Sequence, residues 1–263
     1  MIFYRDPMHT EKKNIGCIPD FFFHGIPGYY IQTSSVDRRL LKGEQLRSKR
    51  ILNVGCGSYL LDDIYFAMNG AKVIGIDYSN KAVDQANKKL ETAKEKRLFD
   101  YLDIKIEWGD GRNLRFSDDF FDIVVSYSAI EHIPSPKDRL RTVTEMARVA
   151  KRGGAVVITV PNYLNLPTTF LSRRMYKKIK EFEYRYTPAE LKRMLTYNHL
   201  KIEKFDAESV YVMDKHLIET RLPELKNIPS FFLRPMSWLL WGFNYFPLLK
   251  KFGMRMGYRA RKI

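Results

Sequence analysis

The sequence predicts an α/β protein built around a mostly parallel β-sheet, and three neighbouring features support this prediction. Residues 51–54 and 72–76 are short apolar runs rich in β-branched side chains, which is typical of buried strands. Between them, residues 60–69 carry apolar side chains at helical spacing and end at Gly70, a suitable C-cap. Strand, helix and strand follow one another within about thirty residues, the length of a βαβ unit.

A glycine turn and an acidic residue occupy the two positions of this unit where ligands bind. Gly55 and Gly57 follow the first strand, and they let the backbone turn sharply and approach a ligand without a Cβ in the way. Asp77 follows the second strand, where a carboxylate can accept both hydroxyls of a ribose. Position 60 is Leu where a dinucleotide fingerprint has its third glycine, so no pyrophosphate cradle is expected.

The rest of the chain continues the alternation of strands and helices. Apolar periodicity and turn residues predict helices over residues 36–47, 81–97 and 136–150, and strands over 103–107, 119–126 and 155–160. Gly153 and Gly154 are expected to end the last of these helices before its strand begins. Thr187-Pro-Ala-Glu190 is a capping box that opens a helix reaching Tyr197.

Composition places the chain among globular proteins and makes its C-terminal part basic. The 263 residues are 45% hydrophobic and 29% charged, and Cys17 and Cys56 supply neither a disulfide framework nor a zinc ligand set. Of the net charge of +15, most lies in residues 161–263, which hold 20 Lys and Arg against nine Asp and Glu. Such an excess suits an anionic partner such as nucleic acid or a membrane surface, and equally a solvated surface.

The quoted segments together resemble class I S-adenosylmethionine-dependent methyltransferases. Residues 51–59 resemble motif I of that family, and Asp77-Tyr78-Ser79 resembles the end of its second strand. The resemblance extends over roughly residues 48–162 and is strongest to the small-molecule branch that includes quinone-biosynthesis enzymes. Its further segments are 108–116, 120–126, 128–133 and 146–162.

The resemblance implies a Rossmann-like three-layer sandwich with a seven-stranded, mostly parallel sheet and helical additions at both ends. Strands at 200–205 and 209–213 are expected to form the antiparallel pair that closes this sheet. The implied division is an N-terminal lid segment over residues 1–49, a methyltransferase core over 50–213 and a C-terminal extension over 214–263. Within the core, residues 162–187 form an insertion on the acceptor side. In the lid, His24 and Tyr29 are expected near the acceptor or packed on the core.

The resemblance also assigns S-adenosylmethionine as cofactor and indicates the residues that hold it. Asp110 would accept the adenine amino group, and Gly111 would keep the backbone close to the base. Asn53 stands where the family usually has an acid, and Tyr59 replaces a frequent glycine, so a non-catalytic binder is an alternative. The expected cofactor-binding residues are Asn53, Gly55, Cys56, Gly57, Asp77, Tyr78, Asp110, Gly111 and Ser126.

The expected catalytic residues are Tyr127 and His132, which follow the fourth strand. Methyl transfer depends mainly on orientation, and a base is needed only when the acceptor is a hydroxyl or an acidic carbon. His132 is the candidate base because an unperturbed imidazole titrates near neutrality, while a structural role for Glu131-His132 in capping the next loop stays open. No metal is expected, because Ser128 replaces the first Glu of the Glu-x-x-Glu-His cluster that some relatives carry.

These features predict methyl transfer to a hydroxyl or carbon of a small, lipophilic acceptor. The run after the fourth strand is Ser126-Tyr-Ser-Ala129, which lacks the Asn/Asp-Pro-Pro-aromatic pattern of enzymes that methylate base or glutamine amines. An RNA methyltransferase is therefore a less favoured alternative, and a cofactor-binding scaffold without chemistry is another.

The last segment raises the question of a membrane partner. Residues 231–249 are apolar and aromatic, and six Lys and Arg follow between positions 250 and 262. Arg234, Pro235 and Pro247 interrupt the run, so it falls short of the roughly 20 residues of a spanning helix. Peripheral contact with an anionic membrane is expected, with packing on the core as the alternative. The first ten residues lack the apolar core of a signal peptide, which favours a cytoplasmic location at the inner face.

Overall fold

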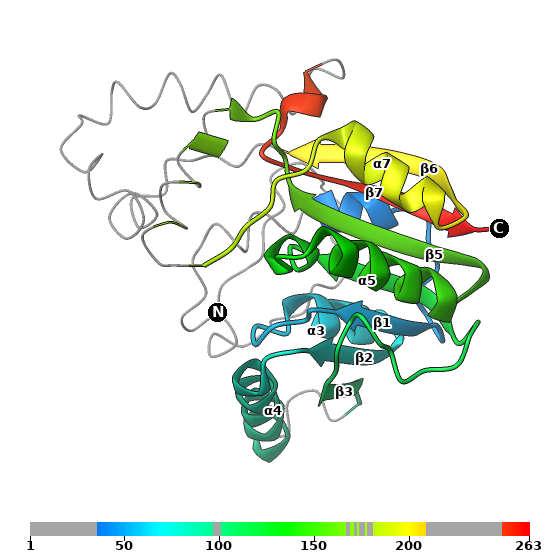
Figure 1. Cartoon of the computed structure of the whole chain (residues 1–263). Helices are drawn as coiled ribbons and strands as arrows, with labels where there is room; N and C mark the ends of the chain where they lie inside the picture. The colour runs from blue at the N-terminus through cyan, green and yellow to red at the C-terminus, as the bar shows by residue number, and fades with distance from the viewer. Residues whose placement is uncertain are drawn as a thin grey trace.

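The protein forms a seven-stranded sheet flanked by helices, as the computed structural model in Figure 1 shows. The structure describes residues 36–96, 101–208 and 249–263, except for several positions between 167 and 180. The strands lie in the order β3-β2-β1-β4-β5-β7-β6, and the first five run parallel. This order confirms the predicted α/β class. His24, Tyr29 and residues 231–248 lie outside the described residues.

The elements follow the predicted alternation with small shifts at their ends. A helix ends at residue 41, earlier than the expected residue 47. The strands are β1 (Arg50–Val54), β2 (Lys72–Asp77), β3 (Asp103–Trp108), β4 (Phe121–Tyr127), β5 (Ala150–Pro161), β6 (Leu200–Glu208) and β7 (Arg255–Lys262). The helices are α3 (Leu61–Met68), α4 (Asn80–Glu95), α5 (Pro136–Val149) and α7 (Pro188–Tyr197), with short 3-10 helices η1 (Ile130–His132) and η3 (Lys250–Phe252).

Parallel pairing brings the ends of the central strands to one edge of the sheet. Asn53 of β1 lies opposite both Gly75 of β2 and Val125 of β4. The loops that leave these strands therefore begin side by side at the carboxyl edge, where open α/β sheets bind ligands. Gly55, Asp77 and Tyr127 are the first residues of these exits or lie next to them.

The expectation that Gly153 and Gly154 end the helix before the fifth strand is wrong, because α5 ends at Val149 and β5 begins directly after it. Ala150 already pairs with Phe121, and the register then shifts so that Ala155 pairs with Ile123. Gly153 absorbs this shift with a φ of +72°, a left-handed conformation that glycine adopts without steric cost. These glycines therefore mark an irregularity within a strand and not the end of a helix.

The seventh strand also comes from a different part of the chain than expected. β7 runs antiparallel between β5 and β6, so the partner of β6 is residues 255–262. The expected strand at 209–213 lies outside the described residues. The basic run at the C-terminus is therefore largely a core strand, and its cations are paired at its rims. Arg259 and Arg261 both make ion pairs with Glu44 and Glu203.

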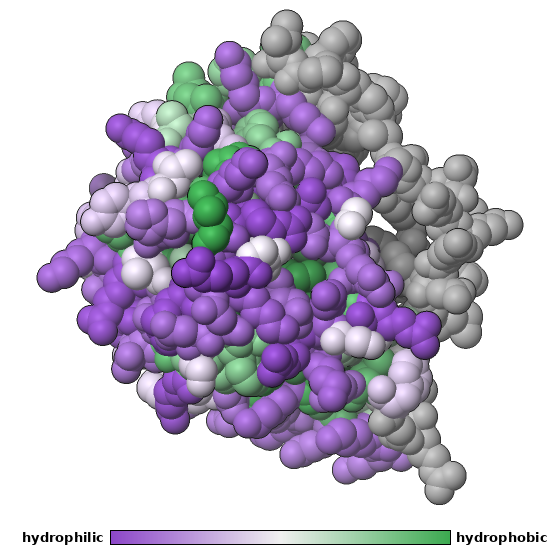
Figure 2. All heavy atoms as spheres, turned by 90° about the vertical axis from the view of Figure 1, so that its right-hand side faces the viewer, coloured by the Kyte–Doolittle hydropathy of each residue, from purple (hydrophilic) through white to green (hydrophobic). Residues whose placement is uncertain are grey.

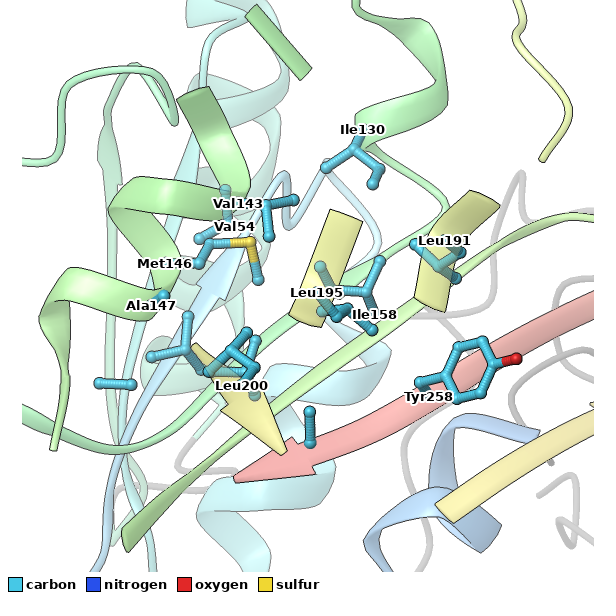
Figure 3. Close-up of a cluster of buried hydrophobic side chains, with 14 of the residues drawn as sticks. Val54, Ile130, Val143, Met146, Ala147, Ile158, Leu191, Leu195, Leu200 and Tyr258 are labelled. Carbon is cyan, nitrogen blue, oxygen red and sulfur yellow. The ribbon is translucent and has the colours of Figure 1, made fainter. Parts of the chain in front are cut away.

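Apolar side chains cover both faces of the sheet. On one face, α5 and α7 pack on the central strands, and Figure 3 shows Val143 and Met146 beside Val54, and Leu195 beside Ile158, within one cluster. On the opposite face, α3 and the helix ending at residue 41 bury Phe66 and Leu40 against the other set of strand residues. The two helical layers thus bury both faces of the sheet.

The outer surface is polar over the face shown in Figure 2, where hydrophilic side chains predominate. Within the described part of the chain, no helix is long and apolar enough to cross a membrane.

Candidate cofactor site and active site

A cavity of about 660 Å³ opens at the carboxyl edge of the sheet. Its walls come from the exits of β1, β2, β3 and β4, together with the start of α3. This volume lies within the roughly 300–1,000 Å³ of small-molecule sites. Tyr59 is one of the residues that line the cavity, and the volume of about 660 Å³ is present with its side chain in place. Ten of the eleven predicted site residues also line it: Gly55, Cys56, Gly57, Asp77, Tyr78, Asp110, Gly111, Ser126, Tyr127 and His132.

The two glycines of the first turn are needed for different reasons. Gly55 has a φ of +78°, and a Cβ there would lie 2.3 Å from Cβ of Ala129, so the turn packs against the exit of β4. Gly57 has a φ of +63°, but a Cβ there would meet no atom within 4 Å. Because Gly57 lines the cavity, this open space is available to a ligand that lies against the backbone.

Asp77 is held in place by two backbone N–H groups. The N–H of Gly57 donates to Oδ2 over 2.9 Å, and the N–H of Ser79 donates to Oδ1 over 2.8 Å. Each oxygen keeps a further lone pair for a ligand, which fits a carboxylate that accepts two ribose hydroxyls. The following residue, Tyr78, is 64% exposed, and its carbonyl accepts a hydrogen bond from Trp108 Nε1.

Asp110 lies beside Asp77 at the exit of β3 and pairs with a neighbouring cation. The guanidinium of Arg112 donates to both oxygens of Asp110 over 2.8 to 3.1 Å, and these hydrogen bonds lower the pKa of that carboxyl. At Gly111 the backbone packs closely against the side chains of Val54 and Thr142. A Cβ at this position would lie 3.1 Å from both of them, so the position favours glycine. Any group that binds Asp110 therefore meets a carboxylate that is already partly neutralised.

The end of β4 brings two hydroxyl groups without partners to the cavity. Ser126 is fully buried, and among the described residues neither its Oγ nor the Tyr127 hydroxyl has a hydrogen-bond partner. Burial raises the pKa of Tyr127 well above its usual value, so its hydroxyl stays protonated. Buried polar atoms nearly always have a partner in complete structures, so these two hydroxyls fit a site that receives a polar ligand.

His132 reaches the cavity from the end of η1. Its Nδ1 lies 3.0 Å from the carbonyl oxygen of Phe182. A carbonyl can only accept, so Nδ1 carries the proton and Nε2 the lone pair. The preceding Glu131 is buried, and this burial raises its pKa to about 7. Glu131 does not line the cavity.

Asn53, the eleventh predicted residue, lies outside the cavity wall. Its side chain lies on the face of the sheet that α3 covers, and its Nδ2 donates to both oxygens of Asp63 over 3.1 Å. Burial raises the pKa of Asp63 to about 7, although the hydrogen bond from Asn53 lowers it. At the position of the usual family acid, Asn53 therefore fastens β1 to α3.

Besides Arg112, which pairs with Asp110, three charged residues line the cavity that the sequence did not indicate: Asp37, Asp62 and Arg255. Asp37 lies in the helix ending at residue 41, Asp62 begins α3, and Arg255 begins β7. Arg255 Nη2 lies 3.1 Å from both oxygens of Asp37, and Thr159 Oγ1 donates to the same carboxylate over 2.6 Å. No sequence motif joins these positions, since Asp37 and Arg255 lie at opposite ends of the chain. In the described residues, no cluster of three or more His, Cys, Asp or Glu side chains could hold a metal ion.

Comparisons with known proteins agree with this geometry. A family model described as a methyltransferase domain matches residues 52–158. Phosphatidylethanolamine N-methyltransferase of Cereibacter sphaeroides is 35% identical over 131 residues, which cover 48% of this chain and 57% of that protein. Ubiquinone biosynthesis O-methyltransferase of Dechloromonas aromatica is 35% identical over 117 residues, which cover 44% of this chain and 46% of that protein. The matches thus span about half the length of these curated relatives.

Solved structures share the fold at low sequence identity. A SAM-dependent methyltransferase from Methanosarcina mazei superposes with a TM-score of 0.58 at 19% identity, covering 87% of this chain and 97% of that one. Magnesium protoporphyrin IX methyltransferase from Synechocystis PCC 6803, with bound S-adenosylhomocysteine (SAH), gives a TM-score of 0.59 at 18% identity. That superposition covers 95% of this chain and 90% of the other.

The sheet order is that of a class I methyltransferase fold, with the glycine turn and the acidic residues lining a cavity at its carboxyl edge. The chain carries a domain of the class I S-adenosylmethionine-dependent methyltransferase family, and the match to the family model covers residues 52–158. S-adenosylmethionine is the cofactor of this class. The open space at Gly57, the backbone-held Asp77 and the unpartnered Ser126 and Tyr127 fit that cofactor.

Proposed function

We propose that the chain transfers a methyl group from S-adenosylmethionine to a hydroxyl or a carbon of a small, lipophilic acceptor. One observation carries this proposal: the cavity that Asp77 and Asp110 line is also lined by apolar side chains. The apolar residues are Leu60, Leu61, Ile130, Ile133 and Pro134. The names of two relatives, which refer to a phospholipid and a quinone, favour an acceptor of the same lipophilic kind.

The residues at the end of β4 would orient the reacting groups. When bound, the cofactor supplies an electrophilic methyl group on a sulfonium. We expect the glycine turn and Asp77 to fix the position of that group, because methyl transfer is an in-line displacement that depends on alignment. The protonated Tyr127 hydroxyl and Ser126 Oγ would then orient the acceptor or the methionine end by hydrogen bonding. Their burial excludes competing water.

His132 would accept the proton when the acceptor is a hydroxyl. Its Nδ1–H is engaged by the Phe182 carbonyl, which holds the ring and leaves the lone pair on Nε2. An imidazole oriented in this way, in a residue that lines the cavity, suits a general base. The competing role, in which Glu131 and His132 fasten the loop after β4, is supported by the hydrogen bond from the Tyr184 N–H to the Glu131 carbonyl.

A cytoplasmic location with peripheral contact to an anionic membrane is part of the same proposal. In the acceptor-side insertion, Leu166 and Phe170 are 63% and 69% exposed, and the exposed Arg173 and Lys177 follow at helical spacing.

Support for contact through residues 231–262 is smaller, since most cations after residue 249 are paired within the protein. That pairing also makes nucleic acid a less favoured partner. Flotation with anionic vesicles tests the contact.

Calorimetric titration with SAH tests the cofactor site. The wild type should bind it, and Asp77→Ala should bind at least about tenfold more weakly, because a carboxylate that accepts two ligand hydroxyls is lost. Asp84→Ala, which removes an exposed carboxylate from α4, should bind like the wild type.

Turnover then tests the chemistry. We expect SAH to accumulate when the protein is given S-adenosylmethionine and a suitable hydroxylated quinone-like or lipid acceptor. His132→Gln should lower kcat with little effect on SAH affinity. A protein that binds SAH and turns over none of a broad set of acceptors would instead be a non-catalytic binder.

A further inference from the structure

Asp62 is a carboxylate in the cavity wall for which the described residues provide no partner. It lies in the first turn of α3, is half-buried and is one of the residues that line the cavity. None of the residues that the structure describes makes a hydrogen bond or ion pair with it. Burial, and then the charge of nearby Asp37, raises the pKa of Asp62 to about 6, so it is mostly ionised at neutral pH.

The neighbouring cation is already shared between two other carboxylates. Arg255 lies 3.1 Å from Asp37 and 3.9 Å from Glu208. Arg38, on the helix ending at residue 41, lies over the ring of Tyr65, with 4.5 Å between the guanidinium carbon and the ring centroid. The charges of Arg38 and Arg255 lower the pKa of Asp62, but neither guanidinium makes a hydrogen bond or ion pair with it.

Two tyrosine residues share this cavity with Asp62. Tyr127 and Tyr59 both line it, and the Tyr127 hydroxyl has no hydrogen-bond partner among the described residues. Lys89 Nζ lies 5.3 Å from the centroid of the Tyr59 ring. The charge of Asp62 is one cause of the raised pKa of Tyr127, which places the two groups within electrostatic range of each other. A carboxylate beside aromatic rings is the combination that binds organic cations, through charge and through cation–π contacts.

We propose that Asp62, together with Tyr127, forms a subsite for an ammonium group at this end of the cavity. The inference rests on the proposed function, because that function brings two sources of an ammonium group to the cavity. One is the amino group of the methionine end of the cofactor, and the other is an amine carried by the acceptor. Both need an acceptor of hydrogen bonds that also carries a negative charge, and the half-buried Asp62 supplies it.

Calorimetry on the full-length chain separates the two sources. The titrants are SAH, 5′-methylthioadenosine, which lacks the amino-acid end, and octylamine with and without saturating SAH. The variants are Asp62→Asn, which keeps the shape of the side chain, and Asp84→Asn as the matched control on the surface of α4. Chemical unfolding is measured for each, because Asp62 also lies at a helix N-terminus, where a negative charge stabilises the helix.

Either of two results supports the subsite. If the cofactor supplies the ammonium group, Asp62→Asn binds SAH about tenfold more weakly and methylthioadenosine unchanged, since only one of them carries the amino group. If the acceptor supplies it, both nucleosides bind unchanged, while octylamine binds the wild type and not the variant. The subsite is wrong if Asp62→Asn, folded at the temperature of the titration, binds all three titrants like the wild type.

A wild type that binds neither nucleoside contradicts the proposed function. The octylamine titration without SAH still tests the subsite in that case, and a wild type that does not bind the amine either contradicts both.

The affinity of the protein for the ammonium ligand should also depend on pH. Because the pKa of Asp62 is about 6, wild-type affinity for the ammonium ligand should fall as pH decreases below 6, when the carboxylate gains a proton. Asp62→Asn should lack this component of the pH profile, and Asp84→Asn should keep it. The other charged or titratable groups that interact with Asp62 or with Tyr127 are Asp37, Arg38, Asp63, Tyr65 and Arg255, and burial raises the pKa of Asp63 to about 7.

Discussion

Gly57 and Gly153 have similar backbone conformations but different surroundings, which makes them a matched pair. Their φ angles are +63° and +72°, and a Cβ at either would meet no atom within 4 Å. Alanine at each position should therefore cost about 1–2 kcal/mol of unfolding free energy, the cost of a left-handed conformation. Only Gly57 lines the cavity, whereas Gly153 lies in the irregular start of β5.

We accordingly expect Gly57→Ala to bind SAH at least about tenfold more weakly than Gly153→Ala, because its Cβ occupies ligand space. Urea unfolding gives the stability of each variant, and calorimetry gives the affinity. Equal affinities in the two variants would mean that no ligand lies against the backbone of Gly57.

At the scale of single residues, the local sequence located most of the site but not its charges. Gly55, Gly57 and Asp77 were recognisable because each follows an apolar run at a fixed spacing, and a strand exit is a local feature. Asn53 lies in the same motif, yet the alternation of side chains along β1 turns it to the opposite face and onto Asp63. Asp37, Asp62 and Arg255 have no local signature, because only tertiary packing brings them together.

At the scale of secondary structure, α7 shows how much a local signal can specify. Thr187 Oγ1 accepts the Glu190 N–H over 3.2 Å, the Glu190 side chain accepts the Thr187 N–H over 3.4 Å, and Pro188 occupies the first position. These contacts confirm the predicted capping box and the predicted helix start. All of them lie within four residues, so the sequence alone determines them.

Removal of the cap should destabilise the protein measurably. Thr187→Ala should lower the unfolding free energy by about 1 kcal/mol, because the Glu190 N–H in the first turn of α7 loses its side-chain acceptor. Thr92→Ala, in the exposed interior of α4, is the control and should change stability little, since alanine is the better helix former there. Urea midpoints compare the two, and equal losses would show that the box adds nothing beyond helix propensity.

The strands were harder to delimit than the helices, and β5 and β7 show why. In β5, Gly153 and Gly154 suggest the end of a helix, but pairing with β4 already holds Ala150 in an extended conformation. In β7, the cations suggest a solvated tail, although the neighbouring strands and Glu44 supply acidic partners for Arg259 and Arg261. Strand pairing is a contact between distant segments, so composition within one segment does not reveal it.

At the scale of the whole molecule, the exposed apolar residues of the acceptor-side insertion predict a membrane-facing side. Leu166 and Phe170 are exposed, and Arg173 and Lys177 lie on the same helical stripe. Apolar side chains beside cations suit the headgroup region of an anionic bilayer. We expect full-length protein to float with anionic vesicles at low salt and to be released as salt screens the charges.

A double variant, Leu166→Ser with Phe170→Ser, should float several-fold less than the wild type, because burial of apolar side chains drives insertion. Tyr197→Ser is the matched control, because Tyr197 is 72% exposed at the far end of α7. Wild-type protein that stays in solution with anionic vesicles at low salt would contradict the membrane proposal, and equal flotation of all variants would place the contact elsewhere.

The sequence by itself determined the class of the fold, the glycine turn, the acid after the second strand and the family they indicate. These features are set by periodicity and by turn chemistry over a few residues, and the family model and the sheet order bear them out. Tertiary structure alone decided that residues 255–262 complete the sheet and that Asp37, Asp62 and Arg255 line the same cavity. These juxtapositions depend on which distant strands pair, and pairing is selected by the burial and charge balance of the whole molecule.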